Sequence, residues 1–498
     1  MTPYLQRFAA GLILAGGFAV PATGISAAAA NDDGRAPAAF DAPEADEALS
    51  GGQATSTRTP NRNAFSHSSA NLPFAKELNF KVGNGFFRRL WVTAPASTQA
   101  ADGLGPLYNA RACQRCHLKD GRGHPPAGNH PEDDAVSMFL RLSIPPRTDG
   151  ERALLASGRA AVIPEPTYGG QLQDFAIAGI RAEGRMEITY AEEPVALGDG
   201  TVVSLRRPTY RVVDPQYGPL HPDTLLSPRV APPMIGLGLL ELVPEAAIVA
   251  DADPDDANGD GISGRAQRVW DVTADRLALG RFGWKAGNPT VDQQSQGAFA
   301  GDMGLSTPLF PDGAGECTDA QADCRAAPNG NSPQYEDLEV PTKVATMVLF
   351  YARNLAVPAR RGVDDPRVLA GKELFHGAGC ASCHRPRFVT GDDPAQPHLS
   401  NQTIRPFTDL LLHDMGPGLA DGRPEGRADG REWRTAPLWG IGLTERVSGH
   451  TQFLHDGRAR SLLEAILWHG GEAQAARDAV AALDADRRAD LIRFLESL

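Results

Sequence analysis

The sequence predicts a mainly α-helical protein with long loops and few short strands, divided into two domains. Three observations predict it. Apolar residues recur at helical spacing over 341–356, 365–377 and 478–498. Glycine and proline are frequent through 145–233, where only short strands such as 201–205 are expected. The same five-residue cysteine motif occurs once in each half of the 498-residue chain.

The two motifs are CQRCH, with Cys113, Cys116 and His117, and CASCH, with Cys380, Cys383 and His384. Cys-x-x-Cys-His is the attachment signature of c-type haem, in which two thiols bind the vinyl groups and the histidine binds iron. A zinc ribbon would bring its cysteine pairs within about 20 residues, and a redox dithiol does not need the trailing histidine. We therefore expect two covalently bound haem c groups.

The helix expected over 365–377 lies directly before the second motif, which is how small cytochrome c domains begin. We expect residues 365–498 to form a C-terminal cytochrome c domain. Residues 65–356 are expected to form a larger cytochrome c-like domain, expanded by loops and carrying the first haem. Residues 31–64 have no apolar period and are rich in Ala, Asp, Ser and Thr, so they predict a flexible leader.

Residues 1–30 have the order of a secretory signal peptide, with a positive charge, a 13-residue apolar run and small residues before a polar segment. Such a run is too short to span a bilayer comfortably. We expect a periplasmic protein that does not span the membrane after cleavage. The net charge of −13 disfavours nucleic acid as a partner and suits a small basic redox protein.

The two remaining cysteines, Cys317 and Cys324, lie close together in a polar loop. In an exported protein this spacing favours a small disulfide, with a metal site as the alternative. The disulfide would leave no cysteine as a free nucleophile.

The tripeptide Asp-Gly-Arg occurs four times, at tight turns. The guanidinium groups of Arg122 and Arg458 are candidates to pair with haem propionates, since guanidinium binds carboxylates well. A solvated turn is the alternative for both, and it is the favoured interpretation for Arg423 and Arg431.

The loop 253–264 contains Asp256, Asn258 and Asp260 at alternate positions before a glycine, which is the front half of a calcium loop. The closing glutamate of an EF-hand would fall at Gln267 and is missing. Calcium and an ordinary acidic turn are equally good interpretations.

Several segments, in order over residues 65–475, resemble the bacterial di-haem cytochrome c peroxidase superfamily, and more closely its di-haem thiol oxidoreductase branch. They include DGLGPLYNARACQRCH, APPMIGLGLLELVPE, FGWKAG, GDMGLSTPLF, GKELFHGAGCASCH and FLHDGRARSLLEAILWHGGEA. The resemblance implies one haem in each domain. It also implies that electrons enter at the C-terminal haem and that a peroxide-type substrate is reduced at the N-terminal haem.

The resemblance places the second axial ligand of the C-terminal haem at His469, where relatives have Met or Tyr. Helical spacing puts Leu462, Ile466 and His469 on one face, which agrees. A buried core histidine is the alternative, and His455 and Met415 are the substitutes.

The N-terminal haem has no clear second ligand. His130 and His124 follow His117 closely and are candidates, although either is equally a surface loop residue. If the position is open, peroxide cleavage needs an acid/base group, and Glu241 in an apolar setting is the candidate. The other interpretation is a charged residue at a helix end.

Trp284 and Trp439 are candidates to relay electrons between the haems, and core packing is the alternative for both. The function predicted is peroxidase-like oxidoreductase activity. The alternatives are oxidation of a residue of a partner protein and a non-enzymatic electron carrier.

Overall fold

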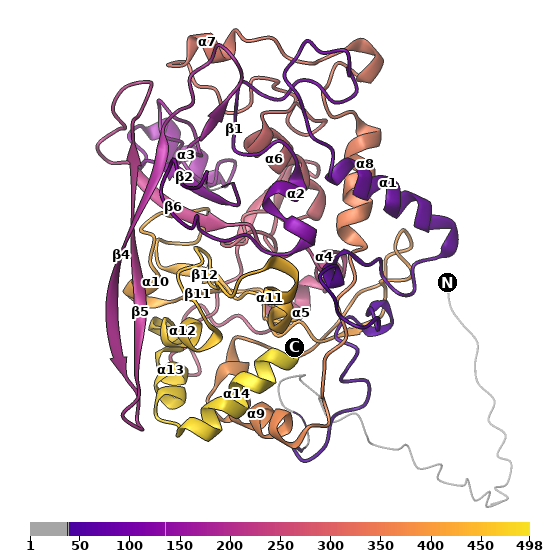
Figure 1. Cartoon of the computed structure of the whole chain (residues 1–498), viewed down its shortest axis with the longest axis vertical. Helices are drawn as coiled ribbons and strands as arrows, with labels where there is room; N and C mark the ends of the chain where they lie inside the picture. Colours follow the sequence, from indigo (N-terminus) through magenta and orange to yellow (C-terminus); the bar gives the residue numbers. More distant parts are fainter. Residues whose placement is uncertain (1–36, 38, 135) are drawn as a thin grey trace, which may run out of the picture. The chain divides into compact units, whose positions relative to one another are not determined.

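The computed structural model describes residues 37, 39–134 and 136–498, in which helices and loops predominate (Figure 1). The described residues belong to one compact unit, Gly34–Leu498. The signal peptide expected over 1–30 lies outside them. A helix-rich fold with few strands agrees with the sequence prediction. None of the helices in the described part of the chain is long and apolar enough to cross a membrane.

The α-helices are α1 (Glu77–Phe87), α2 (Cys113–Cys116), α3 (Asp149–Ser157), α4 (Leu237–Glu241), α5 (Glu245–Val249), α6 (Val291–Met303), α7 (Ala322–Arg325), α8 (Thr342–Arg353), α9 (Pro366–Gly377), α10 (Gly416–Leu419), α11 (Thr444–Ser448), α12 (Leu462–Leu467), α13 (Gln474–Ala481) and α14 (Ala485–Ser497). The 3-10 helices are η1 (Gly52–Ala54), η2 (Ala64–Ser66), η3 (Phe74–Lys76), η4 (Leu118–Asp120), η5 (Pro333–Tyr335), η6 (Cys380–Ser382), η7 (Ile441–Leu443) and η8 (Gly471–Ala473).

The strands pair only as antiparallel two-stranded sheets in the described residues. The pairs are β1 (Leu107–Tyr108) with β3 (Phe175–Ala176), β2 (Met138–Ser143) with β6 (Leu225–Val230), β4 (Arg185–Ala196) with β5 (Val202–Val213), β7 (Arg268–Asp271) with β8 (Arg276–Leu279), β9 (Phe388–Val389) with β10 (Thr403–Ile404), and β11 (Leu412–Asp414) with β12 (Glu432–Arg434).

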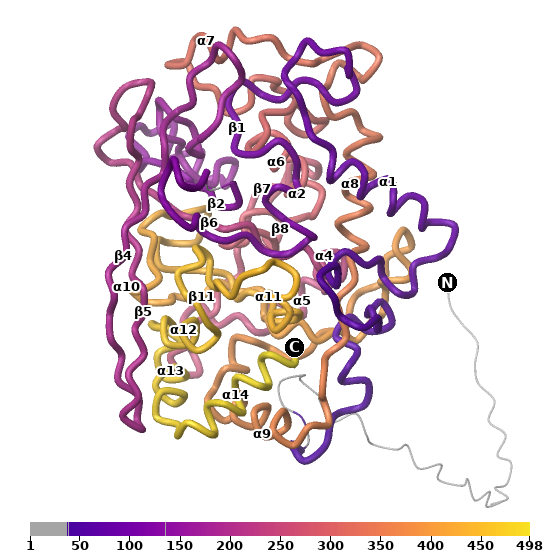
Figure 2. The backbone as a smooth tube through the Cα atoms, in the orientation of Figure 1, coloured from indigo at the N-terminus to yellow at the C-terminus, as the bar shows by residue number. Residues whose placement is uncertain are grey.

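The hairpin β4–β5 is the longest sheet, with 12 residues in each strand. It contains the strand expected near 201–205. Its tip lies beside the C-terminal helices (Figures 1 and 2). There the Gly198 amide donates to the Ala481 carbonyl at 2.8 Å, and Arg488 pairs with Asp199 at 2.6 Å. The hairpin therefore ties the loop-rich first part of the chain to its end.

Two helix pairs cross closely, one beside each cysteine motif. A Cβ on Gly83 of α1 would lie 2.2 Å from the Met347 carbonyl oxygen of α8, and a Cβ on Gly371 of α9 would lie 2.0 Å from the Asp490 carbonyl oxygen of α14. Only glycine permits either approach. The helix expected over 365–377 is confirmed: Asp365 caps it by accepting from the Arg367 amide at 2.9 Å.

The hydrophobic core crosses the expected domain boundary. One buried cluster joins Met138 and Leu140 of β2 to Phe375 of α9 and Phe494 of α14. The division into residues 65–356 and 365–498 stays a prediction, and in this structure the two parts share a core.

The expectation of a flexible leader over 31–64 is not met by its described second half. Glu47, Ser50 and Ala54 are buried. Glu47 accepts from Arg360 and, at 2.9 Å, from Lys372 of α9. The low-complexity composition concealed this packing because the partners lie more than 300 residues further along the chain.

Candidate haem site

A cavity of about 650 Å³ is lined by both cysteine motifs. Cys113, Cys116 and His117 of the first motif face it, and so do Cys380, Cys383 and His384 of the second. The fold therefore brings the two motifs to one internal space, although they lie far apart in the sequence.

The four motif cysteines form no disulfide, in contrast to Cys317 and Cys324, which form the expected one. Burial raises the pKa of Cys113 and of Cys380 to about 12. These thiols are protonated at neutral pH, and a protonated buried thiol is a poor nucleophile. Thiol catalysis is therefore disfavoured, and the free thiols remain available for attachment to a cofactor.

Both motif histidines are held in the tautomer that binds metal. His117 Nδ1 lies 2.8 Å from the Pro232 carbonyl oxygen, and His384 Nδ1 lies 2.9 Å from that of Phe407. A carbonyl accepts only, so Nδ1 carries the proton and Nε2 keeps its lone pair. Burial lowers the pKa of each ring to about 4, which keeps both neutral at pH 7. Metal-binding imidazoles need this neutral form.

His469 has the same arrangement. It follows α12, lines the cavity, and has Nδ1 2.7 Å from the Ala465 carbonyl oxygen. Its Nε2 is therefore the nitrogen with the free lone pair. The substitutes Met415 and His455 also line the cavity. The His455 ring lies flat on Trp433, with 3.7 Å between the ring centroids, as an aromatic packing residue does.

Two arginines that line the cavity have a buried nitrogen without a hydrogen-bond partner in the described part of the chain. Nε of Arg122 and Nε of Arg423 are buried without a hydrogen-bond partner among the described residues, and both side chains line the cavity. The prediction of a solvated turn for Arg423 is wrong: it is 3 % exposed. Exposed Arg431 agrees with that prediction. A buried unpartnered guanidinium nitrogen is costly, so these sites fit an anionic ligand such as a propionate.

Arg458 is buried, but it is not among the described residues that line the cavity. Its Nε lies 2.8 Å from Asp456 Oδ2, and its Nη1 donates to the Gly418 carbonyl at 2.6 Å. The candidate propionate contact is therefore better placed at Arg423 than at Arg458. The sequence could not separate the two because both follow Asp-Gly.

A buried ionic cluster surrounds Arg423. Glu425 Oε2 lies 2.8 Å from Arg423 Nη1 and 2.8 Å from Arg229 Nη2, and the two guanidinium groups hold the pKa of Glu425 far below its usual range despite its burial. Lys285 Nζ, fully buried, lies 2.9 Å from Asp421 Oδ1. Arg229 and Lys285 carry no local signal for this cluster, because their partners Glu425 and Asp421 lie more than 100 residues further along the chain.

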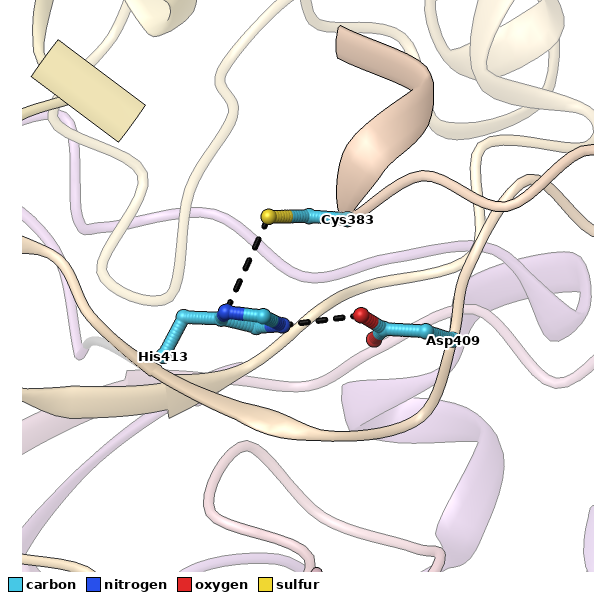
Figure 3. Close-up of side chains that lie close together, drawn as sticks. All are labelled: Cys383, Asp409 and His413. Carbon is cyan, nitrogen blue, oxygen red and sulfur yellow. Dashed lines mark hydrogen bonds and ion pairs between the residues drawn. The ribbon is translucent and has the colours of Figure 1, made fainter. Parts of the chain in front are cut away.

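His413 of β11 lies between three groups beside the second motif, and Figure 3 shows two of them, Cys383 and Asp409. Its Nε2 lies 2.8 Å from Asp409 Oδ2, its Nδ1 lies 2.6 Å from Glu472 Oε2, and the Cys383 sulfur is 3.7 Å away. Burial opposes the charge, but Asp409 outweighs it and the pKa of His413 stays well above its usual value. Cys383, Asp409 and His413 resemble a metal-ligand cluster. A thioether at Cys383 would remove the thiolate ligand.

His130 and His124, the candidates for the sixth ligand of the first haem, lie outside the set of described residues that line the cavity. His130 is exposed, with Nδ1 3.5 Å from Asp134, and His124 is exposed near His450. The structure gives no support for either as an iron ligand.

Glu241 also lies outside the set of described cavity-lining residues. One carboxylate oxygen accepts from the Val291 amide at 2.8 Å, and the other pairs with Arg353 Nε at 2.5 Å. Both oxygens are occupied in joining α4 to the start of α6 and to α8. This arrangement matches the alternative interpretation of a structural charge. The geometry therefore does not support Glu241 as the acid/base group.

The two candidate tryptophans, Trp284 and Trp439, line the cavity and are buried. Trp284 Nε1 donates to the Val230 carbonyl at 2.8 Å, and its ring meets His455 edge to face at 6.5 Å. Trp439 packs in a hydrophobic cluster with Phe65 and Ile235. Both side chains make packing contacts, as the core interpretation predicts, and an electron-relay role for either stays a prediction.

The acidic loop 253–264 is held by its own hydrogen bonds. Both oxygens of Asp256 accept from the Gly261 amide, and Asn258 Oδ1 accepts from the Asp260 amide at 2.8 Å. These contacts are those of a turn, and calcium binding at Asp256, Asn258 and Asp260 stays a prediction.

Comparison with protein families matches residues 45–498 to the family described as "Di-haem oxidoreductase, putative peroxidase". The chain belongs to this family. A comparison with curated proteins gave no match. The family implies two haem groups, and the described residues fit them: two cysteine pairs, three imidazoles with Nε2 available and two unpartnered arginine nitrogens face one cavity. Membership in this di-haem oxidoreductase family also confirms the resemblance seen in the sequence.

Proposed function

We propose that this di-haem oxidoreductase is a periplasmic c-type peroxidase. Its haems are bound covalently through Cys113 and Cys116 and through Cys380 and Cys383. The observation that carries the proposal is the inequality of the two sites. Of the described histidines that line the cavity, three have Nδ1 fixed by a carbonyl. We assign two of these, His384 and His469, to the C-terminal site.

Attachment fits the four neutral thiols, which need no other role. Arg122 and Arg423 would pair with propionates through the nitrogens that lack protein partners. When bound, the haems supply one-electron redox chemistry and, at the N-terminal site, an iron position for peroxide. The overall reaction takes two electrons and two protons per hydrogen peroxide and yields two waters.

Asp302 of α6 is the residue we propose to move a proton at the N-terminal site. It lines the cavity, and burial raises the pKa of its carboxyl group despite Arg141, whose Nη2 is 3.9 Å away. Gln171 Nε2 donates to its Oδ1 at 3.1 Å, which orients the carboxyl group. A buried carboxyl group with a raised pKa can hold a proton near neutral pH and release it.

Electrons enter at the C-terminal haem in this proposal. Two fixed imidazole ligands, His384 and His469, suit electron transfer because the ligand set stays unchanged. They should also give a lower potential than a His/Met pair. The edge-to-face rings of Trp284 and His455 lie in the cavity that both motifs line. The donor would be a small redox protein, and the chain's net charge of −13 favours a basic one.

The experiment is spectroscopy of the purified protein with and without hydrogen peroxide. We expect one high-spin and one low-spin haem, with peroxide changing the high-spin signal. The electron-carrier alternative predicts two low-spin haems that ignore peroxide, and that result would remove the peroxidase proposal. Consumption of peroxide with oxidation of a co-purified protein, and no turnover with a redox donor, would favour the partner-oxidising alternative.

A further inference from the structure

The structure repeats one local arrangement at a shift of 171 residues, in the segments 282–302 and 453–473. In the first, the Phe282 amide donates to the Asn288 carbonyl at 3.0 Å. In the second, the Phe453 amide donates to the Ala459 carbonyl at 2.8 Å. Both contacts form isolated antiparallel bridges. The same turn is therefore built twice from different side chains.

The backbone repeats as well. Gly283 and Leu454, which correspond, both have positive φ angles, 82° and 71°. A leucine rarely adopts that conformation, so its presence at the matching place indicates that the turn is imposed by the fold. The helices that follow are capped in the same way. Thr290 accepts from the amide three residues on at the start of α6, and Ser461 does so at the start of α12, both at 3.1 Å.

The two segments also present matching faces to the cavity. The positions that line it in both copies are the pairs Phe282 and Phe453, Gly283 and Leu454, Trp284 and His455, Val291 and Leu462, Gln294 and Ala465, Ser295 and Ile466, Ala298 and His469, and Asp302 and Ala473. The lining positions therefore correspond in sequence, although α6 continues to Met303 whereas α12 ends at Leu467, two residues before His469.

Each copy lies beside one cysteine motif. Near the N-terminal motif, the amides of Asn109 and Ala110 donate to the Asp302 carbonyl at 2.8 and 3.1 Å. Near the C-terminal motif, Glu472 pairs with His413, and His413 contacts Cys383 (Figure 3). The first copy therefore covers the N-terminal haem site, and the second covers the C-terminal one.

The copies differ at the position that carries the ligand. His469 stands eight residues after the cap of α12, and Ala298 stands eight residues after the cap of α6. We propose that Ala298 is the residue that leaves the sixth coordination position of the N-terminal haem open, and that position 298 decides which haem accepts an external ligand. This inference rests on the proposed function, in that both haems must be attached.

The reason is chemical as well as steric. An alanine side chain ends at its Cβ and has no atom that can bind iron. The histidine at the matching place has such an atom, Nε2. Gln294, one turn earlier on the same face of α6, provides an amide that can hydrogen-bond a bound ligand. The site takes small ligands, with hydrogen peroxide as the substrate and cyanide as the probe.

The test is Ala298→His, read by electron paramagnetic resonance and by cyanide titration of the fully loaded protein. A histidine there can donate Nδ1–H to the Gln294 carbonyl, as His469 does to that of Ala465. We expect the high-spin signal of the wild-type protein to disappear and cyanide binding to be lost. Ala300→His, on another face of α6, is the control. We expect it to keep both the high-spin signal and cyanide binding.

A second variant keeps the proposal testable if Ala298→His does not fold. Ala298→Leu fills the site without a ligand atom, so the haem should stay high-spin and bind cyanide more slowly. The proposal is overturned if folded Ala298→His and Ala298→Leu proteins keep the wild-type spectrum and cyanide kinetics. Wild-type protein that binds cyanide at one haem but does not reduce peroxide would instead overturn the proposed function alone.

Discussion

Glu47 offers a sharp test of how the N-terminal segment is held, through the substitution Glu47→Gln. The wild-type carboxylate faces two buried cations, Arg360 and Lys372, whose side chains are 1 % and 4 % exposed. Glutamine keeps the shape and removes the charge. Among the residues that the structure describes, Lys372 would keep only the more distant Glu44, at 3.7 Å, as an acidic ion-pair partner. Arg360 would keep the Ser497 hydroxyl and the Phe494 ring.

Removing one member of a buried ion pair costs about 3–5 kcal/mol, because the remaining charge is uncompensated. The unfolding entropy is about 2 cal/mol/K per residue, or roughly 1 kcal/mol/K for a chain of this length. We therefore expect Glu47→Gln to lower the melting temperature by about 3–5 °C at neutral pH.

The assay is thermal unfolding followed by calorimetry, with Glu373→Gln as the control. Glu373 is exposed on α9, next to Lys372 in sequence. Its substitution removes the same charge from the same region, and surface changes of this kind shift stability by no more than about 0.5 kcal/mol. Equal melting temperatures for the two variants would refute the buried anchor.

The stability that Glu47 contributes depends on pH, and its sign follows from the pKa shift of Glu47. Burial would raise the pKa of Glu47, but Arg360 and Lys372 outweigh it and hold the pKa below its ordinary value of 4.5. A depressed folded-state pKa contributes stability that is present above the unfolded value and lost as pH falls through the folded value. The difference between wild type and Glu47→Gln should thus be constant above about pH 5 and shrink below pH 4.5.

Three further predictions concern the haem sites and the disulfide. His469→Ala should make the C-terminal haem high-spin in electron paramagnetic resonance and leave the signal of the N-terminal haem unchanged. If the signals of both haems stay as in the wild type, His469 is not an iron ligand. Asp302→Asn should slow peroxide turnover by about 10²–10⁴-fold in a steady-state assay, with cyanide affinity at the N-terminal haem unaltered. Replacing both Cys317 and Cys324, which are separated by 7 positions, with serine should lower the free energy of unfolding in urea by about 2–3 kcal/mol. An unchanged free energy of unfolding would show that the disulfide does not stabilise the fold.

The sequence predicted the features that depend on neighbouring residues. The cysteine motifs, the helix beginning at Pro366 and the bridge between Cys317 and Cys324 are all set within a few positions. Helical spacing predicted that Leu462, Ile466 and His469 share one face, and all three line the cavity.

Features that depend on distant contacts could not be predicted. The sequence predicts a surface turn at Arg423, but its buried Nη2 donates to the carbonyl of Leu142, which lies 281 residues earlier in the chain. Glu241 lies in an apolar stretch, as an acid/base group would. Its role is decided by Arg353, more than 100 positions away. The acid/base candidate Asp302 carries no local signal. Comparing segment 282–302 with 453–473 would have indicated that the helix face carrying Asp302 lines the cavity.

The anchoring of Glu47 also bears on the order of events as the chain is made. Arg360 and Lys372 lie 313 and 325 residues after it. A contact over such a separation forms only after both ends have been synthesised, because closing the intervening loop comes late. The first motif is therefore complete long before the N-terminal segment can dock. If haem is attached covalently as proposed, Cys113 and Cys116 are therefore available for attachment before the N-terminal segment docks.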